Sequence, residues 1–281
     1  MKVIIVGGVA GGASCAARLR RLSEDAEIVL FERGENISYA NCGLPYYLGG
    51  IIREESALTV ASPALLRDRF RIDVRIRSEV TAIDRENHTV TVRTPEGEYR
   101  ESYEKLVLTP GASPKTFGLV GEGVFTLRDV HDTLSIDAYL KGTGTREVLV
   151  AGGGFIGVEM AENLAHRGLK VTLAEFAPQI MPPFDPELAL LLQDALEKGG
   201  VTVRTNTGVK TIEKQENALI VTFTDGSVAQ TGAVVLALGV APETTLAKAA
   251  GLKIAENGGI AVDDRMCTSD PDIFAAGDAV T

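Results

Sequence analysis

Two glycine-rich turns, each followed by an acidic residue, are the places where this sequence could bind a nucleotide. Gly152, Gly154 and Gly157 form a complete GxGxxG pattern between an apolar run and a segment of helical composition. In such a pattern the glycines allow a tight turn, close approach of a pyrophosphate and helix packing, while the helix N-terminus attracts the phosphate charge. Glu175 ends the next apolar run, where a carboxylate accepts hydrogen bonds from ribose hydroxyls and repels a 2′-phosphate. We therefore expect NADH rather than NADPH at this turn.

The first glycine-rich turn, at residues 7–12, is less regular. Gly7 and Gly12 hold the first and third positions of the pattern, whereas Val9 occupies the middle one. Glu32 ends the following apolar run, as in the second copy. Two such turns in one chain indicate two dinucleotides, and the chemistry that uses two is hydride transfer from a nicotinamide to a flavin. We therefore expect FAD and NADH as cofactors.

Each turn lies inside a pattern that predicts a strand, a helix and a second strand. The two predicted βαβ units comprise residues 2–6, 13–22 and 27–31, and residues 147–151, 158–167 and 170–174. Alternating segments that predict an antiparallel β-meander follow each unit, at 79–83, 88–93 and 98–102, and at 201–203, 209–213, 218–223 and 227–229. Each copy then closes with an apolar strand ending in glycine, at 106–111 and 233–239. The expected fold class is α/β, with two Rossmann-like nucleotide-binding domains that each carry a β-meander insertion.

Composition excludes several other classes of protein. A length of 281 residues predicts about two domains. The net charge of −10 argues against nucleic acid or an anionic membrane surface as the main partner. No run of about 18 apolar residues predicts a membrane span, and glycines interrupt the apolar N-terminus too often for a signal peptide. Three cysteines without a CxxC pair predict neither a disulfide framework nor a zinc site, and a reducing cytoplasm fits them best.

Three further segments carry a resemblance to a known family. Residues 108–114 read LTPGASP, residues 238–242 read LGVAP, and residues 268–278 read TSDPDIFAAGD. With the two glycine turns, they make nearly the whole chain similar to the FAD- and NAD(P)H-dependent disulfide oxidoreductases. The resemblance implies an FAD-binding domain formed by residues 1–112 and 241–281 and an NAD-binding domain formed by residues 113–240.

The resemblance also bears on the end of the chain. In the family, a flavin-contacting helix and a C-terminal dimerisation domain follow the second FAD motif, whereas this sequence stops at Thr281, soon after Asp278. We therefore expect the C-terminal dimerisation domain to be absent from this chain and the full-length protein to form a homodimer.

Cys42 is the candidate redox residue. It is the single cysteine of the segment 38–47, SYANCGLPYY, and Ile37 and Tyr47 stand where a CxxxxC partner would lie. The segment therefore resembles the single-cysteine branch of the family, and most of all coenzyme A disulfide reductase and NADH-dependent persulfide reductase. A helix that starts near Cys42 would favour the thiolate, which is the form that attacks a disulfide. The bland alternative is a small buried hydrophobe, which is how we interpret Cys15 and Cys267.

The expected reaction passes electrons from NADH through FAD to a sulfur substrate at Cys42: a coenzyme A disulfide, a persulfide or a polysulfide. One alternative is an NADH oxidase or peroxidase that uses a Cys42 sulfenic acid. The Ala40-Asn41 pair before the cysteine argues against this alternative. A second alternative is a flavin reductase for a protein partner, with Cys42 inert.

The resemblance assigns roles to further residues. Asp278 is expected on the ribityl chain, Phe155 as a gate over the nicotinamide site, and Arg21 near a coenzyme A phosphate. His88, His131 and His166 occur singly and are predicted to be neither catalytic nor metal ligands. The residues expected to contact FAD are Gly7, Val9, Ala10, Gly12, Glu32, Arg33, Ser38, Asn41, Val80, Pro110, Gly111, Ala112, Gly277 and Asp278. The residues expected to contact NAD are Gly152, Gly154, Phe155, Ile156, Gly157, Glu175 and Gly239.

Overall fold

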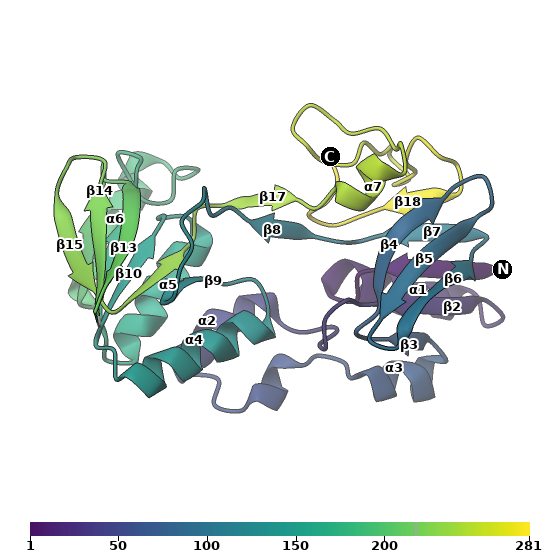
Figure 1. Ribbon diagram of the computed structural model, residues 1–281, viewed down its shortest axis with the longest axis horizontal. Coiled ribbons are helices and arrows are strands. Elements are labelled where there is room, and N and C mark those ends of the chain that lie inside the picture. The colour runs from purple at the N-terminus through teal and green to yellow at the C-terminus, as the bar shows by residue number, and fades with distance from the viewer. Residues whose placement is uncertain (217) are drawn as a thin grey trace. The chain divides into compact units, whose positions relative to one another are not determined.

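The computed structural model describes residues 1–216 and 218–281 and divides them into two compact units (Figure 1). The first unit consists of Met1–Tyr39, Thr59–Ser113 and Ala241–Thr281. The second unit consists of Ala40–Leu58 and Pro114–Val240. Each unit has its own parallel sheet.

The sheet of the first unit has the strand order β18-β7-β1-β2-β3, and every neighbouring pair is parallel. Its central strand, β1, is apolar on both faces: Val3 and Ile5 belong to one buried cluster and Ile4 to another. Buried parallel strands need such continuous apolar runs because helices and loops cover both faces. The strands are β1 Lys2–Val6, β2 Glu27–Phe31, β3 Asp73–Arg75, β7 Lys105–Leu108 and β18 Ile273–Ala275, and the helices are α1 Ala10–Leu22, α3 Pro63–Phe70 and α7 Thr245–Ala249.

The sheet of the second unit repeats this plan, with the parallel order β12-β11-β10-β16-β9. Its strands are β9 Val124–Thr126, β10 Glu147–Ala151, β11 Lys170–Ala174, β12 Val201–Arg204 and β16 Ala233–Leu236. Its helices are α2 Leu44–Leu48, α4 Val130–Thr143, α5 Phe155–His166 and α6 Pro186–Lys198, with short 3₁₀ turns at Asn41–Gly43 and Glu55–Leu58. The predicted α/β class with two Rossmann-like units is therefore confirmed.

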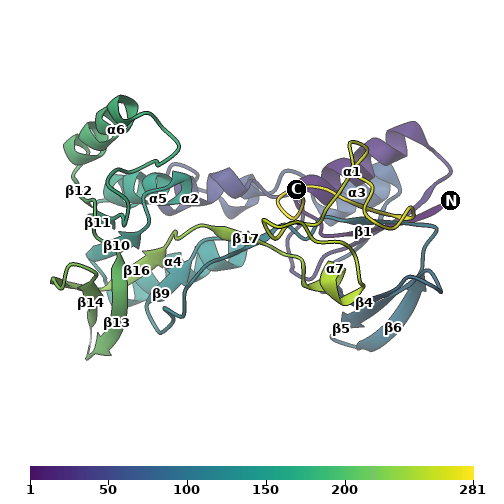
Figure 2. The same cartoon turned by 90° about the horizontal axis from the view of Figure 1, so that it is seen from above.

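An antiparallel β-meander accompanies each sheet, as the alternating segments predict. In the first unit it consists of β4 Glu79–Asp84, β5 Thr89–Thr94 and β6 Gly97–Ser102. In the second it consists of β13 Val209–Gln215, β14 Ala218–Phe223 and β15 Val228–Thr231. The chain passes between the units through β8 Ala112–Pro114 and β17 Val240–Pro242, which pair with one another (Figure 1); Figure 2 shows β17 from above.

The two units share a detailed pattern of backbone bonds, which goes beyond a similar order of elements. In each unit a glutamate follows the second strand of the βαβ motif. Its N–H donates to the last residue of the neighbouring strand, and its carbonyl accepts the N–H of the residue three positions after that last residue. Ser38 and Met181 both have positive φ, 45° and 47°. The N–H of Ser38 donates to the carbonyl oxygen of Gly8, and that of Met181 donates to the carbonyl oxygen of Gly153. The equivalent bonds are Glu32 N to Arg75 O and Ser78 N to Glu32 O in the first unit, and Glu175 N to Arg204 O and Thr207 N to Glu175 O in the second.

Two features differ from the sequence-based expectations. The first helix begins at Ala10 and the helix of the second copy at Phe155, each three residues earlier than predicted. Residues 40–58, expected within the domain 1–112, pack instead with the second unit, because α2 lies against α4 and α5. Which nucleotide each unit binds stays a prediction. Among the described residues, none of the helices is both long and apolar enough to cross a membrane.

Candidate functional site

The two glycine turns are built so that only glycine fits at their first and third positions. Gly7 has φ +99°, and a Cβ placed there would lie 2.2 Å from the Thr109 carbonyl oxygen. A Cβ at Gly12 would lie 1.8 Å from the carbonyl oxygen of Gly7. These distances are far below van der Waals contact, so the strand end and the helix approach as closely as the fingerprint requires.

The second turn has the same geometry. Gly152 has φ +104°, and its Cβ would lie 2.3 Å from the Ala237 carbonyl oxygen; a Cβ at Gly157 would lie 1.8 Å from the oxygen of Gly152. A Cβ at Gly154 would meet nothing within 4 Å. Open space at this middle position is what close approach of a pyrophosphate to the backbone needs, and Val9 fills the corresponding position of the first turn with a side chain.

Both turns lead directly into a helix N-terminus. The first intrahelical bonds are donated by Ala13 to the Val9 carbonyl in α1 and by Val158 to the Gly154 carbonyl in α5. The N–H groups before these donors have no intrahelical acceptor and carry the positive end of the helix dipole. Each turn can therefore bind a phosphate anion.

A glutamate carboxylate is fixed beside each turn. In both units one carboxylate oxygen accepts the N–H of the second glycine and the other accepts the N–H of the residue two positions after the glutamate. The donors are Gly8 and Gly34, at 2.8 Å each, for Glu32, and Gly153 at 2.5 Å and Ala177 at 2.7 Å for Glu175. A carboxylate has about four lone-pair sites, so each glutamate retains acceptors for ribose hydroxyls.

Thr109 is a residue that the sequence reasoning missed. Its hydroxyl donates to the carbonyl oxygens of Val6, at 2.9 Å, and Gly7, at 3.0 Å, and so holds the first turn against the end of β7. The sequence signal that could have identified Thr109 is a hydroxyl residue placed directly after an apolar strand. The second unit has Ala237 at this position, whose N–H donates to Ala151 as that of Thr109 donates to Val6.

The other predicted FAD ligands fall into two groups. Most lie in the first unit: Ala10 opens α1, Arg33 and Ser38 follow β2, Val80 is buried in β4, Pro110, Gly111 and Ala112 follow β7, and Gly277 and Asp278 follow β18. Asn41 lies instead in the second unit, directly before Cys42. The predicted NAD ligands all lie in the second unit, with Phe155 and Ile156 exposed at the start of α5 and Gly239 exposed after β16.

The environments of the cysteines separate Cys42 from the other two. Cys42 is exposed within the 3₁₀ turn that leads into α2, while Leu44, Pro45 and Leu48 anchor that helix as buried residues. A helix does therefore begin beside this thiol, as expected, and the thiol is no buried hydrophobe. Cys15 is half-buried in α1, where burial raises the pKa of its thiol and so disfavours the reactive thiolate.

The arginines of α1 do not share one solvated face. Arg18 and Arg21 are exposed, and Arg21 remains available to an anion. Arg20 is only 9% exposed and caps the ends of two helices through its guanidinium. Its acceptors are the carbonyl oxygens of Phe70, Arg71, Ser23 and Glu24.

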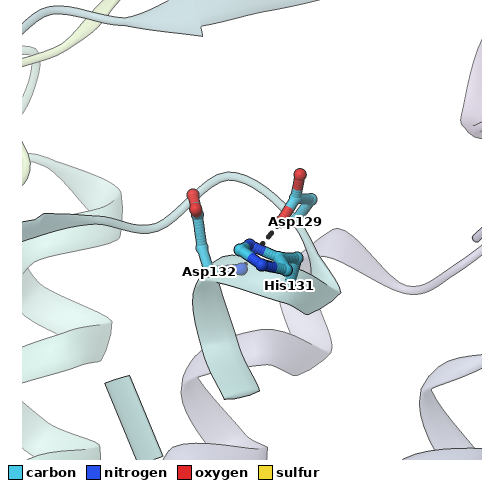
Figure 3. A group of neighbouring side chains, drawn as sticks. All are labelled: Asp129, His131 and Asp132. Carbon is cyan, nitrogen blue, oxygen red and sulfur yellow. Dashed lines mark hydrogen bonds between the residues drawn. The ribbon is translucent and has the colours of Figure 1, made fainter. Parts of the chain in front are cut away.

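Asp129, His131 and Asp132 form the one group with metal-ligand geometry found among the described residues (Figure 3). Their closeness has a structural explanation. Asp129 is the N-cap of α4 and accepts the N–H of Asp132 at 2.8 Å, while the Asp132 carboxylate accepts the N–H of Arg128 at 2.8 Å. This arrangement resembles a capping box, except that the Asp132 carboxylate accepts from the residue before the N-cap. Burial, and then the negative charge of Asp129, raise the pKa of Asp132.

A cavity of about 780 Å³ in the second unit lies away from the glycine turn. It is bordered by Glu147, the first residue of β10, whereas the turn follows Ala151 at the other end of that strand. Ligands of open parallel sheets bind beyond the carboxyl ends of the strands, so this cavity is not the dinucleotide site.

Two Rossmann-like units in one chain, each with a glycine turn and a fixed glutamate, are the arrangement typical of a protein that binds two dinucleotides, and here a free thiol is exposed at the start of a short helix. The particular family follows from the sequence comparison. All 281 residues match the family model described as pyridine nucleotide-disulphide oxidoreductase, and the chain belongs to that family.

Similar proteins of known name include disulfide and persulfide reductases. Coenzyme A disulfide reductase of Staphylococcus aureus strain JH9 is 36% identical over 282 aligned positions, which cover 100% of this chain and 64% of that protein. The reduced CoADR-RHD of Bacillus anthracis has a TM-score of 0.96 and 47% identity, covering 99% of this chain and 51% of the other. The NAD-dependent persulfide reductase from A. fulgidus has a TM-score of 0.96 and 36% identity, covering 100% of this chain and 53% of the other. The chain thus spans between half and two thirds of the length of these relatives.

Proposed function

We propose that this chain forms the FAD- and NADH-binding part of a reductase for coenzyme A disulfide or a related persulfide or polysulfide, with Cys42 as its single redox thiol. The observation that carries the proposal is the exposed Cys42 at the start of α2, in a chain whose three cysteines are all free. The names of the similar proteins support the choice of sulfur substrate.

The binding roles follow from the two turns. We assign FAD to the first unit, where Gly7, Gly12 and Glu32 would hold its pyrophosphate and ribose. We assign NADH to the second unit, where Gly152, Gly157 and Glu175 would do the same. FAD, when bound, supplies the transfer of two electrons from NADH to sulfur.

The chemistry at Cys42 is thiol–disulfide exchange. Its thiolate attacks one sulfur of the substrate disulfide, so that a mixed disulfide forms on Cys42 and one thiolate leaves. Two electrons that originate from NADH, with a proton, then cleave the mixed disulfide. This releases the second thiol and restores the Cys42 thiolate. With a persulfide or polysulfide, the Cys42 thiolate takes up the outer sulfur and a shorter thiolate or polysulfide leaves. Two electrons and a proton then release that sulfur as hydrosulfide and restore the Cys42 thiolate.

Replacing Cys42 with serine tests the proposal. The FAD-loaded protein is reduced anaerobically with NADH, and reoxidation of the flavin by coenzyme A disulfide is followed by absorbance. We expect Cys42→Ser to be reduced by NADH at the normal rate and to lose reoxidation by the disulfide by about a hundredfold or more. Cys15→Ser is the matched control and should behave as the wild type.

Two outcomes would contradict this assignment. Undiminished turnover of the disulfide by Cys42→Ser would show that the thiol has no part in the reaction. Reoxidation of the wild type by oxygen or peroxide, but by no sulfur compound, would point to an oxidase or peroxidase instead.

A further inference from the structure

The segment that carries Cys42 is held at its far end by two side chains at the C-terminal end of α5, those of its last residue His166 and its C-cap Arg167. The Nδ1 atom of His166 lies 3.1 Å from the carbonyl oxygen of Gly49. Because a carbonyl can only accept, His166 must carry its proton on Nδ1. The Nη1 atom of Arg167 donates to the carbonyl oxygen of Leu48 at 3.1 Å. Both acceptors lie at the end of α2, at Leu48 and at its C-cap Gly49.

These bonds matter because α2 cannot be stable by itself. It has five residues, fewer than half of what an isolated helix needs in water. The last carbonyls of any helix have no intrahelical donor, and cationic or imidazole side chains can satisfy them. In α2 the donors come from another helix, so its C-terminal cap depends on tertiary structure.

Arg167 is itself fixed by an ion pair. Its Nη2 atom lies 2.8 Å from an Oδ atom of Asp137 on α4, and the two side chains are 21% and 15% exposed. Asp137 also pairs with Lys141 at 2.7 Å on its other oxygen. Arg167 therefore joins α4 to α2. Lys141 pairs with Asp137 and, among the residues that the structure describes, makes no hydrogen bond to α2.

The contact between α2 and α5 is also tight at the backbone. A Cβ on Gly49 would lie 2.5 Å from Oδ1 and 3.0 Å from Cβ of Asn163, a residue that is 1% exposed. The end of α2 therefore rests directly on α5. The N-terminus of α5 follows the glycine turn assigned to NADH, and its 12 residues span about 18 Å.

We propose that His166 and Arg167 are positioning residues for the Cys42 thiol. By holding the carbonyls of Leu48 and Gly49, they attach the thiol segment to the helix that also presents the NADH turn. This inference rests on the proposed role of Cys42. It implies that the unit to which we assign NADH fixes the position of the thiol.

Four variants and one control test the proposal in the FAD-loaded protein. Arg167→Met removes the bond to Leu48 and the ion pair, and Arg167→Lys keeps the charge. His166→Leu removes the donor, and His166→Asn keeps an N–H near the position of Nδ1. Lys141→Met is the control because it removes a partner of Asp137 alone.

The first readout is hydrogen exchange of the amides of Gly49, Gly50 and Ile51, which bond within the turn at the end of α2. We expect exchange there to become about tenfold faster in Arg167→Met and His166→Leu, with partial recovery in the Lys and Asn variants and no change in Lys141→Met. The second readout is turnover. The kcat with coenzyme A disulfide should fall about tenfold, while flavin reduction by NADH and the KM for NADH stay unchanged.

The proposal is overturned if these amides exchange at the wild-type rate in Arg167→Met and His166→Leu. It is also overturned if exchange quickens while disulfide turnover is unaltered, or if reduction by NADH falls in parallel. These failures differ from failure of the proposed function, which is read from Cys42→Ser alone.

Discussion

At residue scale, the absence of a single methyl group decides whether each nucleotide turn can form. Gly12 and Gly157 hold the third position of the GxGxxG pattern. Both lie against the carbonyl of the first glycine, and a Cβ at either would lie 1.8 Å from that oxygen. Gly154 differs, because its Cβ would stand in open space. Gly12 and Gly157 therefore allow the turn to close, whereas Gly154 leaves room for the ligand.

Alanine substitutions separate these two roles. Gly157→Ala should lower the stability of the second unit by about 1–3 kcal/mol, because the chain must move to admit the methyl group. Gly154→Ala should leave the unfolding temperature nearly unchanged but weaken NADH binding, which titration calorimetry would measure. Normal NADH affinity in a stably folded Gly154→Ala variant would contradict the assigned pyrophosphate position.

The Glu175 carboxylate is expected to select the nucleotide. Glu175→Ala removes the acceptor of the Gly153 and Ala177 N–H groups and the negative charge beside the turn. We expect weaker binding of NADH, by about 1.5–3 kcal/mol for a lost charged acceptor, and a smaller preference over NADPH. The measurement is kcat/KM for flavin reduction by each nucleotide. Glu32→Ala is the matched control, since it should weaken FAD retention and leave the NADH/NADPH ratio as it is.

At the scale of elements, sequence patterns located the strands and turns well because their signals are local. Apolar runs such as Ile4 to Val6 and the spacing of Gly152 and Gly157 depend on neighbouring residues only. The association of residues 40–58 with the second unit could not be predicted, because it depends on contacts between α2 and a helix more than a hundred residues later. Arg20 was missed for the same reason: its acceptors at Phe70 and Arg71 are distant in sequence.

An ion-pair network ties three strands of the first unit together and should give its stability a pH dependence. Glu101 on β6 accepts from Lys2 of β1 and Arg75 of β3, at 2.6 Å each. Burial opposes the charged carboxylate, but these two cations outweigh it and hold the pKa of Glu101 below its usual 4.5. A lowered carboxyl pKa stabilises the fold above the unfolded-state value, and this contribution is lost as the pH falls through the folded-state value.

Arg75→Met tests that network. The variant should be less stable than the wild type at pH 7. The difference should shrink as the pH falls below 4.5, because Glu101 becomes protonated in the wild type as well. Urea unfolding of the first unit at several pH values provides the measurement. A difference that stays constant down to pH values where the carboxyl is protonated would assign the loss to packing of Arg75 on Phe31, 5.4 Å from the ring centre, rather than to charge.

At the scale of the whole molecule, the chain contains two Rossmann-like units, and each has its own glycine turn, glutamate and meander. Each cofactor should therefore stabilise the unit to which it binds. A ligand at a hundred times its Kd adds about 2.7 kcal/mol to the unit's stability. Hydrogen exchange should show FAD protecting residues 7–12 and NADH, added to the FAD-loaded protein, protecting residues 152–157. Protection of residues 152–157 by FAD alone would contradict the assignment of cofactors.

The repeated bonds of the two units have a consequence for the history of the chain. Two copies that share even their positive-φ residues, Ser38 and Met181, are best explained by duplication of one ancestral module. After Met181 the second copy reaches its next helix through residues 182–185, whereas after Ser38 the first copy takes residues 39–62 to reach α3. The extra stretch contains Cys42 and packs with the second unit. The segment that carries the proposed redox thiol thus has no counterpart in the second copy of the module, and yet that copy is the one that supports it.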